Sequence, residues 1–353
     1  MDKFDIRSAT IDEMSDFMTK IGEKPYRGKQ IFSWINNKMV DSFDEMTDLS
    51  KDLRQKLMQH AYISLISIAS LQVSKEDGTK KVLFELQNYS RINNDAVEAV
   101  LMHYKHGYSI CLSTQVGCAM SCDFCASGIM GLKHNLTAGQ IAAQFYHLAK
   151  MAGDRISNLV LMGIGEPLDN YDEVLKFISI INHPLGVNLG QRSITLSTCG
   201  LVPEIYRLAE EGLQINLAIS LHAPNDQIRR RLMPIARKYD IDTLLEACRA
   251  YGQNGRRITF EYIMLDGVND HKSHAIELAR RIKEQMAGVQ THVNIIPANE
   301  VPEKGYGKSS PSVVRHFVET LQKEGINTTV RRELGSDISA ACGQLKSEID
   351  KMR

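Results

Sequence analysis

The sequence predicts an α/β fold, in which a partial (β/α)6 barrel is joined to a small helical N-terminal accessory domain through a β-rich connector. Apolar runs of strand length alternate with amphipathic helical stretches from residue 108 onward. The segment before them alternates apolar and polar residues, and the first 62 residues show helical spacing. We expect domains at 1–62, 63–103, 104–335 and 336–353 in this chain of 353 residues.

The N-terminal part is expected to contain three short helices, followed by three strands. Thr10 precedes apolar residues at helical spacing and is a suitable N-cap. The helices are predicted within 10–22, 26–38 and 48–61, and the strands within 63–73, 80–87 and 96–104. The polar stretch 76–79 (EDGT) predicts a turn between the first two strands.

Six strand–helix units make up the predicted barrel. The strand-like runs are 108–116, 158–163, 193–198, 215–222, 258–265 and 292–297, and the helical stretches between them are 136–153, 171–182, 202–212, 241–252 and 271–286. A last helix at 311–325 leads to a final strand at 326–333. Strands that alternate with helices predict a parallel sheet, and the site of such a sheet forms at the carboxyl ends of its strands.

Composition and charge exclude some classes of protein. Hydrophobic residues are 43% and charged residues 24%, which is ordinary for a globular protein. No apolar run approaches the ~20 residues of a membrane span, and the N-terminus lacks the apolar core of a secretory signal. We therefore expect a cytoplasmic protein with no membrane association. Lys plus Arg and Asp plus Glu both total 42, so bulk charge makes no case for a nucleic-acid partner.

Three of the seven cysteines lie close together in the segment 117–128 (GCAMSCDFCASG). Clustered cysteines in a cytosolic protein more often bind a metal or carry out chemistry than form disulfides. Cys118, Cys122 and Cys125 could bind zinc with a distant fourth ligand. They could equally hold a four-iron cluster in which one iron stays open for a substrate. Spacing alone leaves both interpretations open.

Polar and glycine-rich segments follow the other predicted strands. They are GIGEP at 163–167, STCG at 197–200, SLHAPND at 220–226 and PANE at 297–300. Because the carboxyl ends of parallel strands share one edge, these segments should meet the cysteine loop at one mouth. This convergence is stronger evidence for a site than any single motif.

The ordered motifs GCAMSCDFCASG, GIGEPLDN, ITLSTCG, AISLHAPND, RITFEYIMLDGVND and DISAACGQL resemble the RlmN/Cfr subfamily of radical S-adenosylmethionine RNA methyltransferases. The resemblance runs from about Glu98 to Leu345, and EKPYRGKQIFSWI fits the accessory domain of the family less sharply. It implies a radical S-adenosylmethionine barrel and one [4Fe-4S] cluster on Cys118, Cys122 and Cys125. It also implies two molecules of S-adenosylmethionine per turnover.

The resemblance also implies how the nucleoside cofactor is bound. Gly165 and Glu166 match the pair that meets the methionine ammonium. The other implied cofactor positions are Ser197, Ser220, Leu221, His222 and Asn299. Residue type alone would also allow a strand-end cap at Ser197, a turn former at Asn299 and a hydrogen-bonded loop histidine at His222. Cys199 is left without a role, and Cys248 fits a helix core.

The implied reaction needs radical chemistry because an adenine ring carbon such as C2 is not a nucleophile. By the resemblance, Cys342 takes a methyl group from one S-adenosylmethionine, and a radical from a second one removes hydrogen from that methyl group. The resulting methylene radical adds to the base. Cys111 then attacks the Cys342 sulfur and leaves a transient disulfide, while Glu98 accepts the proton from the ring carbon.

The resemblance implies a ping-pong enzyme that makes 2-methyladenosine in the peptidyl transferase centre of 23S ribosomal RNA. Transfer RNA is a second candidate substrate, an external electron donor is required, and a monomer is expected. A Cfr-like adenine C8 methyltransferase conferring antibiotic resistance is the alternative, although Pro167 after the Gly-Glu pair favours C2. A zinc-stabilised, non-enzymatic RNA-binding module is a third interpretation. The run Arg229–Arg231 is expected on a solvated helix face, or against phosphate if it lies close to the mouth, and the same holds for Arg331 and Arg332.

Overall fold

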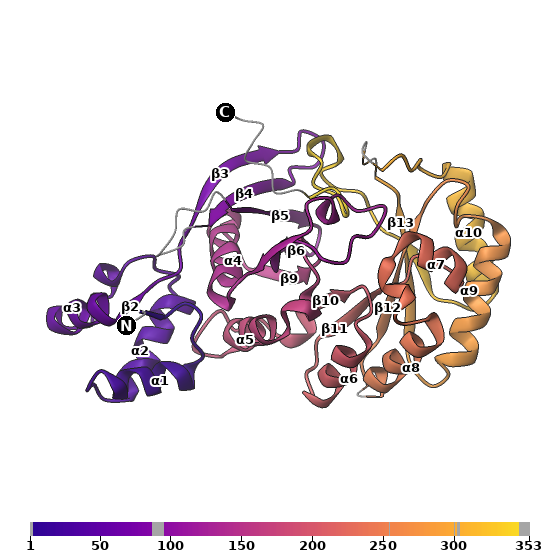
Figure 1. Cartoon of the computed structure of the whole chain (residues 1–353). Coiled ribbons are helices and arrows are strands. Elements are labelled where there is room, and N and C mark those ends of the chain that lie inside the picture. Colours follow the sequence, from indigo (N-terminus) through magenta and orange to yellow (C-terminus); the bar gives the residue numbers. More distant parts are fainter. Residues whose placement is uncertain (1–2, 87–94, 254, 300, 302–303, 346–353) are drawn as a thin grey trace.

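The computed structural model describes residues 3–86, 95–253, 255–299, 301 and 304–345 (Figure 1). It confirms the predicted α/β class, with one mostly parallel sheet and helices along its outer side. The predicted strand end at Gln87, Glu300 of the PANE segment and residues 346–353 lie outside the described residues. None of the helices in the described part has the length and apolar character needed to cross a bilayer.

The N-terminal helices form where the spacing predicts them: α1 (Ile11–Lys20), α2 (Tyr26–Asn36) and α3 (Lys51–His60). Thr10 caps α1 in a reciprocal arrangement, because its hydroxyl accepts from the Glu13 N–H while the Glu13 carboxylate accepts from the Thr10 N–H. A parallel pair of two-residue strands, β1 (Phe4–Asp5) and β2 (Ala61–Tyr62), was not predicted, since two residues carry no alternation signal.

The connector and the barrel share one ten-stranded sheet, in the order β14-β13-β12-β11-β10-β9-β6-β5-β4-β3. The antiparallel part contains β3 (Ile66–Val73), β4 (Lys80–Leu86), β5 (Ala96–Tyr104) and β6 (Gly107–Cys111). The parallel part continues from β6 through β9 (Ile156–Leu161), β10 (Ile194–Thr198), β11 (Asn216–Ser220), β12 (Ile258–Met264), β13 (Thr291–Pro297) and β14 (Thr328–Val330). The β5–β6 pairing therefore joins the predicted connector to the first barrel strand.

Helices cross over between the parallel strands and cover their outer side (Figure 1). They are α4 (Ala138–Ala152), α5 (Tyr171–Asn182), α6 (Val202–Glu210), α7 (Asp226–Leu232), α8 (Ile241–Gly252), α9 (Lys272–Gln285) and α10 (Pro311–Lys323). A small hairpin of β7 (Gln115–Gly117) and β8 (Leu132–Asn135) flanks the cysteine loop. Short 3-10 turns are η1 (Phe43–Glu45), η2 (Ala126–Gly128), η3 (Pro167–Asn170), η4 (Gln191–Ser193), η5 (Pro234–Arg237) and η6 (Ser336–Ile338).

The prediction of a solvated face for Arg229–Arg231 is wrong for Arg229. Arg230 and Arg231 are exposed, but Arg229 is fully buried. Its guanidinium donates to the Cys199 carbonyl at 2.7 Å and to the Tyr239 carbonyl at 3.4 Å. The inner side of α7 faces the loop after β10, where a free carbonyl needs a donor, and Arg229 supplies it.

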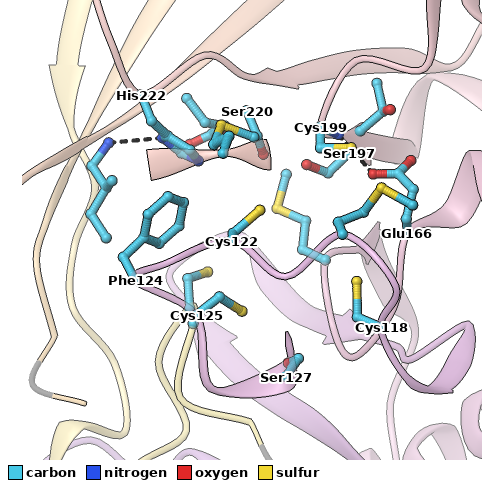
Figure 2. Close-up of a pocket in the computed structure, with 18 of the residues that line it drawn as sticks. Cys118, Cys122, Phe124, Cys125, Ser127, Glu166, Ser197, Cys199, Ser220 and His222 are labelled. Carbon is cyan, nitrogen blue, oxygen red and sulfur yellow. Dashed lines mark hydrogen bonds between the residues drawn. The ribbon is translucent and has the colours of Figure 1, made fainter. Parts of the chain in front are cut away.

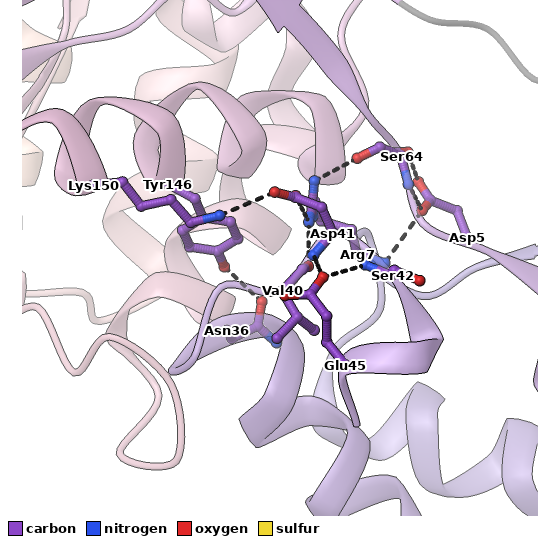
Figure 3. Close-up of polar contacts among 10 residues, drawn as sticks. All are labelled: Asp5, Arg7, Asn36, Val40, Asp41, Ser42, Glu45, Ser64, Tyr146 and Lys150. Carbon is purple, nitrogen blue, oxygen red and sulfur yellow. Dashed lines mark hydrogen bonds and ion pairs between the residues drawn. The ribbon is translucent and has the colours of Figure 1, made fainter. Parts of the chain in front are cut away.

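A buried polar network attaches the N-terminal segment to the barrel (Figure 3). Arg7 is fully buried, and its guanidinium donates to the carbonyls of Ser64 and Val40, both at 2.7 Å, and to Asp41 Oδ1 at 2.8 Å. Lys150 of α4 donates to the other oxygen of Asp41 at 3.0 Å. Burial raises the pKa of Asp41, but hydrogen bonds from Arg7 and Lys150 outweigh it and leave the pKa below its ordinary value.

Replacing Arg7 by methionine should destabilise the protein, because two carbonyls and a carboxylate lose their shared donor. We expect a loss of about 3–5 kcal/mol in the free energy of unfolding, measured by chemical denaturation. The matched control is Arg280→Met on α9, whose side chain is 61% exposed and pairs with Glu284 at 3.7 Å. The control should change the unfolding free energy by less than about 0.5 kcal/mol. Equal effects of the two substitutions would contradict the role given to Arg7.

Candidate active site

One cavity at the carboxyl ends of the parallel strands gathers most of the predicted site residues (Figure 2). We call it the central cavity. The predicted residues that line it are Cys118, Cys122, Cys125, Gly165, Glu166, Ser197, Ser220, His222 and Cys342. They come from the loops after β7 and β9, from the carboxyl ends of β10 and β11, from the loop after β11 and from the C-terminal segment. The convergence predicted from the strand-following motifs is thus present.

The cysteine loop depends on a glycine at its entrance. Gly117 has φ +76°, and a Cβ there would lie 1.8 Å from the Gly131 carbonyl oxygen. The Cys118 N–H donates to that same carbonyl at 3.1 Å. The two loop ends therefore approach more closely than any side chain at position 117 would allow.

Two of the three thiols, Cys118 and Cys122, are shielded from solvent enough to disfavour their charged forms. Burial raises the pKa of Cys118 to about 12. Burial, followed by the charges of Cys125 and Cys118, raises the pKa of Cys122 well above its ordinary value. Among the described residues, no group of three His, Cys, Asp or Glu side chains stands at distances suited to holding a single metal ion. A metal cation would supply the charge that lets three neighbouring thiolates coexist.

A closed zinc site completed by the nearby histidine does not fit this geometry. His134 Nε2 lies 3.1 Å from Asp95 Oδ2, and its Nδ1 lies 3.0 Å from the Asn135 carbonyl. Both ring nitrogens are thus engaged away from the cysteines, and His134 does not line the central cavity. The three-thiol set fits a cluster with one open metal position better.

Glu166 is a buried carboxylate suited to binding a cationic group. Its Oε2 accepts from the Cys199 N–H at 2.7 Å, and its Oε1 accepts from the Leu168 N–H at 3.1 Å. Burial raises the pKa of Glu166, and the structure records no ion pair for it among the described residues. A ligand ammonium in the central cavity would supply the missing positive charge.

His222 is a neutral donor at the wall of the cavity. Its Nδ1 accepts from the Ile263 N–H at 3.0 Å, which leaves the proton on Nε2. Burial lowers the pKa of His222 to about 3, and its ring packs edge-on against Phe124 with 4.8 Å between centroids. The Leu221 side chain is buried in the main core and does not line the cavity, so the predicted cofactor contact of this residue could come only from its backbone.

A smaller side cavity adjoins the central cavity and is lined by Cys111, Asn299, Arg331 and Cys342. Cys342 and Arg331 line both cavities. Burial and then the charge of Cys342 raise the pKa of Cys111 to about 12. Asn299 lies in the side cavity, where its Nδ2 donates to the Cys342 carbonyl at 3.3 Å, so the structure separates it from Ser197 and Ser220.

Glu98 lies on the same face of the sheet as Cys111 but lines neither cavity. Cys111 pairs with Val100 of β5, and Glu98 is two residues before Val100, so both side chains of β5 point to one face. The Glu98 carboxylate pairs with Lys81 of β4 at 3.1 Å, and both side chains are only 11% exposed. The predicted base therefore shares a sheet face with Cys111 and is paired there with Lys81.

Two charged residues at the cavity wall were missed as site residues by sequence reasoning. Arg331 lies 3.8 Å from the buried carboxylate of Glu261, and both line the central cavity. Asn294 fixes that carboxylate with hydrogen bonds of 2.9 and 3.2 Å. The charges of Cys342, then of Glu261, raise the pKa of Arg331. A carboxylate inside the apolar strand run FEYIML was the signal that could have identified Glu261.

Comparisons with known proteins cover nearly the whole chain. Residues 4–63 match the ribosomal RNA large subunit methyltransferase N-terminal domain, and residues 112–279 match the radical SAM superfamily. A probable dual-specificity RNA methyltransferase RlmN of Alkaliphilus oremlandii is 52% identical, over 98% of each chain. The same-named protein of Clostridium novyi is 51% identical, over 97% of each chain.

A solved structure has the same fold throughout. The crystal structure of a radical SAM methyltransferase from Sphaerobacter thermophilus superposes with a TM-score of 0.91 at 42% identity, covering 98% of this chain and 100% of that chain. Full-length identity of this extent, together with the three-cysteine loop, shows that the chain belongs to the RlmN family of radical S-adenosylmethionine RNA methyltransferases, enzymes that use a [4Fe-4S] cluster and S-adenosylmethionine.

Proposed function

We propose that this protein methylates C2 of an adenosine in 23S ribosomal RNA, at the peptidyl transferase centre, and in transfer RNA. The names of full-length relatives as dual-specificity RNA methyltransferases support both substrates. The structural observation that carries the proposal is the position of Cys342. Its side chain lines the central cavity with the three-cysteine loop and the side cavity with Cys111. One sulfur can therefore serve both a cofactor and a resolving thiol.

The central cavity supplies the groups that the two cofactors need. Cys118, Cys122 and Cys125 would hold the cluster, and Glu166 would accept hydrogen bonds from the methionine ammonium. The hydroxyls of Ser197 and Ser220 suit ribose, as does the Nε2–H of His222. When bound, the cluster and S-adenosylmethionine supply a methyl cation equivalent and a hydrogen-abstracting radical. An external electron donor follows from this chemistry, because radical formation consumes an electron.

Cys342 would accept the methyl group as a thiolate. The Arg331 guanidinium lines the same wall, 3.8 Å from the Glu261 carboxylate, which Asn294 holds by hydrogen bonds. The Arg331 guanidinium therefore places a positive charge at the wall that the attacking sulfur shares.

Cys111 and Glu98 would complete the reaction after the base has been attached to Cys342. Attack of the Cys111 thiolate on the Cys342 sulfur forms the S–S bond and breaks the bond between Cys342 and the transferred carbon, which keeps the electron pair of that bond and takes up a proton to become the methyl group. The Cys111 thiol has a pKa of about 12, so it stays protonated and unreactive at neutral pH until a base assists it. Glu98 would accept the proton from the ring carbon, and RNA would present an unstacked adenosine.

Regiochemistry is tested by the modified base itself. Pro167 follows Glu166 at the start of η3 and lines the central cavity, where the C8 relatives tend to have alanine. We expect mass spectrometry of ribosomal RNA digested after anaerobic turnover to show 2-methyladenosine. A product containing 8-methyladenosine would establish the C8 alternative.

Replacing Cys111 by alanine should trap the reaction after the base has joined Cys342. RNA should then migrate with the protein on a denaturing gel, because no thiol remains to break the link. The control is Cys248→Ala, a buried core cysteine of α8 that lines neither cavity. It should turn over within about twofold of the native rate. Release of free methylated RNA by the Cys111 variant would contradict the proposed role.

Replacing any one of Cys118, Cys122 or Cys125 by alanine should remove the cluster and all methylation. The native protein, prepared anaerobically, should contain iron and sulfide and absorb near ~400 nm, and each variant should lose that band. Cys248→Ala again serves as the control and should keep the band. A colourless native protein with one zinc ion would instead support the non-enzymatic alternative.

A further inference from the structure

The turn between β3 and β4 grips the segment that carries Cys342, although more than 250 residues separate them. We call residues 74–81 the hairpin clamp and residues 335–345 the Cys342 segment. The Gly335 N–H donates to Asp77 Oδ2 at 2.9 Å, and the Lys75 N–H donates to Asp337 Oδ2 at 3.0 Å. Lys81 Nζ donates to the Ser339 carbonyl at 3.3 Å. Each of the two segments thus supplies one carboxylate, which accepts a hydrogen bond from a backbone N–H of the other segment.

Hydrogen bonds within the hairpin clamp fix its conformation independently of the Cys342 segment. The Ser74 hydroxyl accepts from the N–H groups of Glu76 and Asp77, both at 3.2 Å. Asp77 Oδ1 accepts from the Thr79 N–H at 2.9 Å, which leaves Oδ2 for Gly335. The carboxylate is therefore fixed by its own turn, and holding it in place costs little additional entropy.

Close packing accompanies these hydrogen bonds. Gly335 has φ +62°, and a Cβ there would lie 2.8 Å from the Ala340 Cβ and 3.0 Å from the Thr79 Cγ2. The Cys342 segment therefore needs glycine at this point to approach the clamp. Apart from the single 3-10 turn Ser336–Ile338, the described part of the segment has no helix or strand of its own. Its position depends on contacts with its surroundings.

The other end of the segment is held by the cysteine loop. The Ala126 N–H donates to the Gly343 carbonyl at 2.8 Å, and the Ser127 hydroxyl donates to the Leu345 carbonyl at 3.0 Å. The Cys342 segment is thus hydrogen-bonded on both sides of Cys342. The hairpin clamp holds the residues before it, and the loop that carries Cys118, Cys122 and Cys125 holds the residues after it. Lys81 of the hairpin clamp also forms an ion pair with Glu98, so the same side chain contacts both the Cys342 segment and the proposed base.

We propose that the hairpin clamp is a positioning element that holds the Cys342 sulfur between the central and side cavities, within reach of both the methyl donor and Cys111. The proposal rests on the methyl-carrying role of Cys342 proposed above. A displacement of about 1 Å can cost an enzyme about 100-fold in rate, so a segment without secondary structure needs such anchors. Asp77 and Asp337 act through Cys342 and touch neither substrate nor cofactor.

The test compares two double variants and one single variant of the full-length protein. Asp77→Ala with Asp337→Ala removes both carboxylates of the contact. Asp77→Asn with Asp337→Asn keeps one amide oxygen at each position, so the Gly335 and Lys75 N–H groups still have an acceptor while the Thr79 N–H loses its partner, and this variant should restore function. Glu85→Gln is the matched control, a carboxylate of β4 with no recorded contact to residues 335–345 in the described part of the chain.

Two readouts separate positioning from simple stability. The first is the rate at which iodoacetamide alkylates Cys342, followed by peptide mass spectrometry with Cys248 as an internal standard. We expect about a tenfold faster rate at Cys342 in the double alanine variant, and no change at Cys248. The second is the yield of methylated RNA per methylated Cys342 in the reconstituted enzyme, which should fall about tenfold.

Several results would overturn the proposal. Equal alkylation of Cys342 in native and double alanine proteins would show that the clamp does not hold the segment. Parallel rises at Cys342 and Cys248 with a lower unfolding midpoint would show that it only stabilises the fold. Failure of the asparagine variant to restore yield would also count against it. If native Cys342 is never methylated, the proposed function fails, while the alkylation comparison still decides whether the clamp holds the segment.

Discussion

The site depends on one constraint, the parallel pairing that runs from β6 to β13. Parallel strands require a crossover for each step, so every loop that follows a strand emerges at the same edge of the sheet. The cysteine loop, Glu166 and Ser220 therefore meet although they are separated by about a hundred residues of chain. The C-terminal segment then crosses this mouth and adds Cys342 to it. Sheet pairing is thus the cause of the chemical arrangement.

Burial determines which ionisation states are favoured among the groups that line the central cavity. Cys118, Cys122 and Glu166 lie where charge is poorly solvated, so their pKa values rise and their anionic forms need cations. The iron ions of a cluster and a methionine ammonium are positively charged partners that would stabilise these anions. Arg331 provides a fixed positive charge where the two cavities meet, beside Cys342. The electrostatics of the chain and the cofactors of its family are therefore complementary.

Sequence predicted the elements well where periodicity and caps agree. The bounds of α5 and α8 match the predicted stretches, and Thr10 caps α1 as expected. Features without a local signal were missed. The buried state of Arg229 and the grip of Asp77 on Gly335 arise from contacts between distant segments, which no periodicity records. Leu221 was assigned by its neighbours in a motif, whereas the alternation of side chains directs it into the core.

The central claim is that Cys342 carries the methyl group between cofactor and RNA. The most direct measurement is peptide mass spectrometry after anaerobic incubation with S-adenosylmethionine that bears a trideuterated methyl group. The account predicts that, before RNA is added, labelled methyl is found on the peptide containing Cys342, and that it is then transferred to adenosine with loss of one deuterium. Labelled RNA that retains all three deuterium atoms, formed while Cys342 never carries the label, would contradict the account.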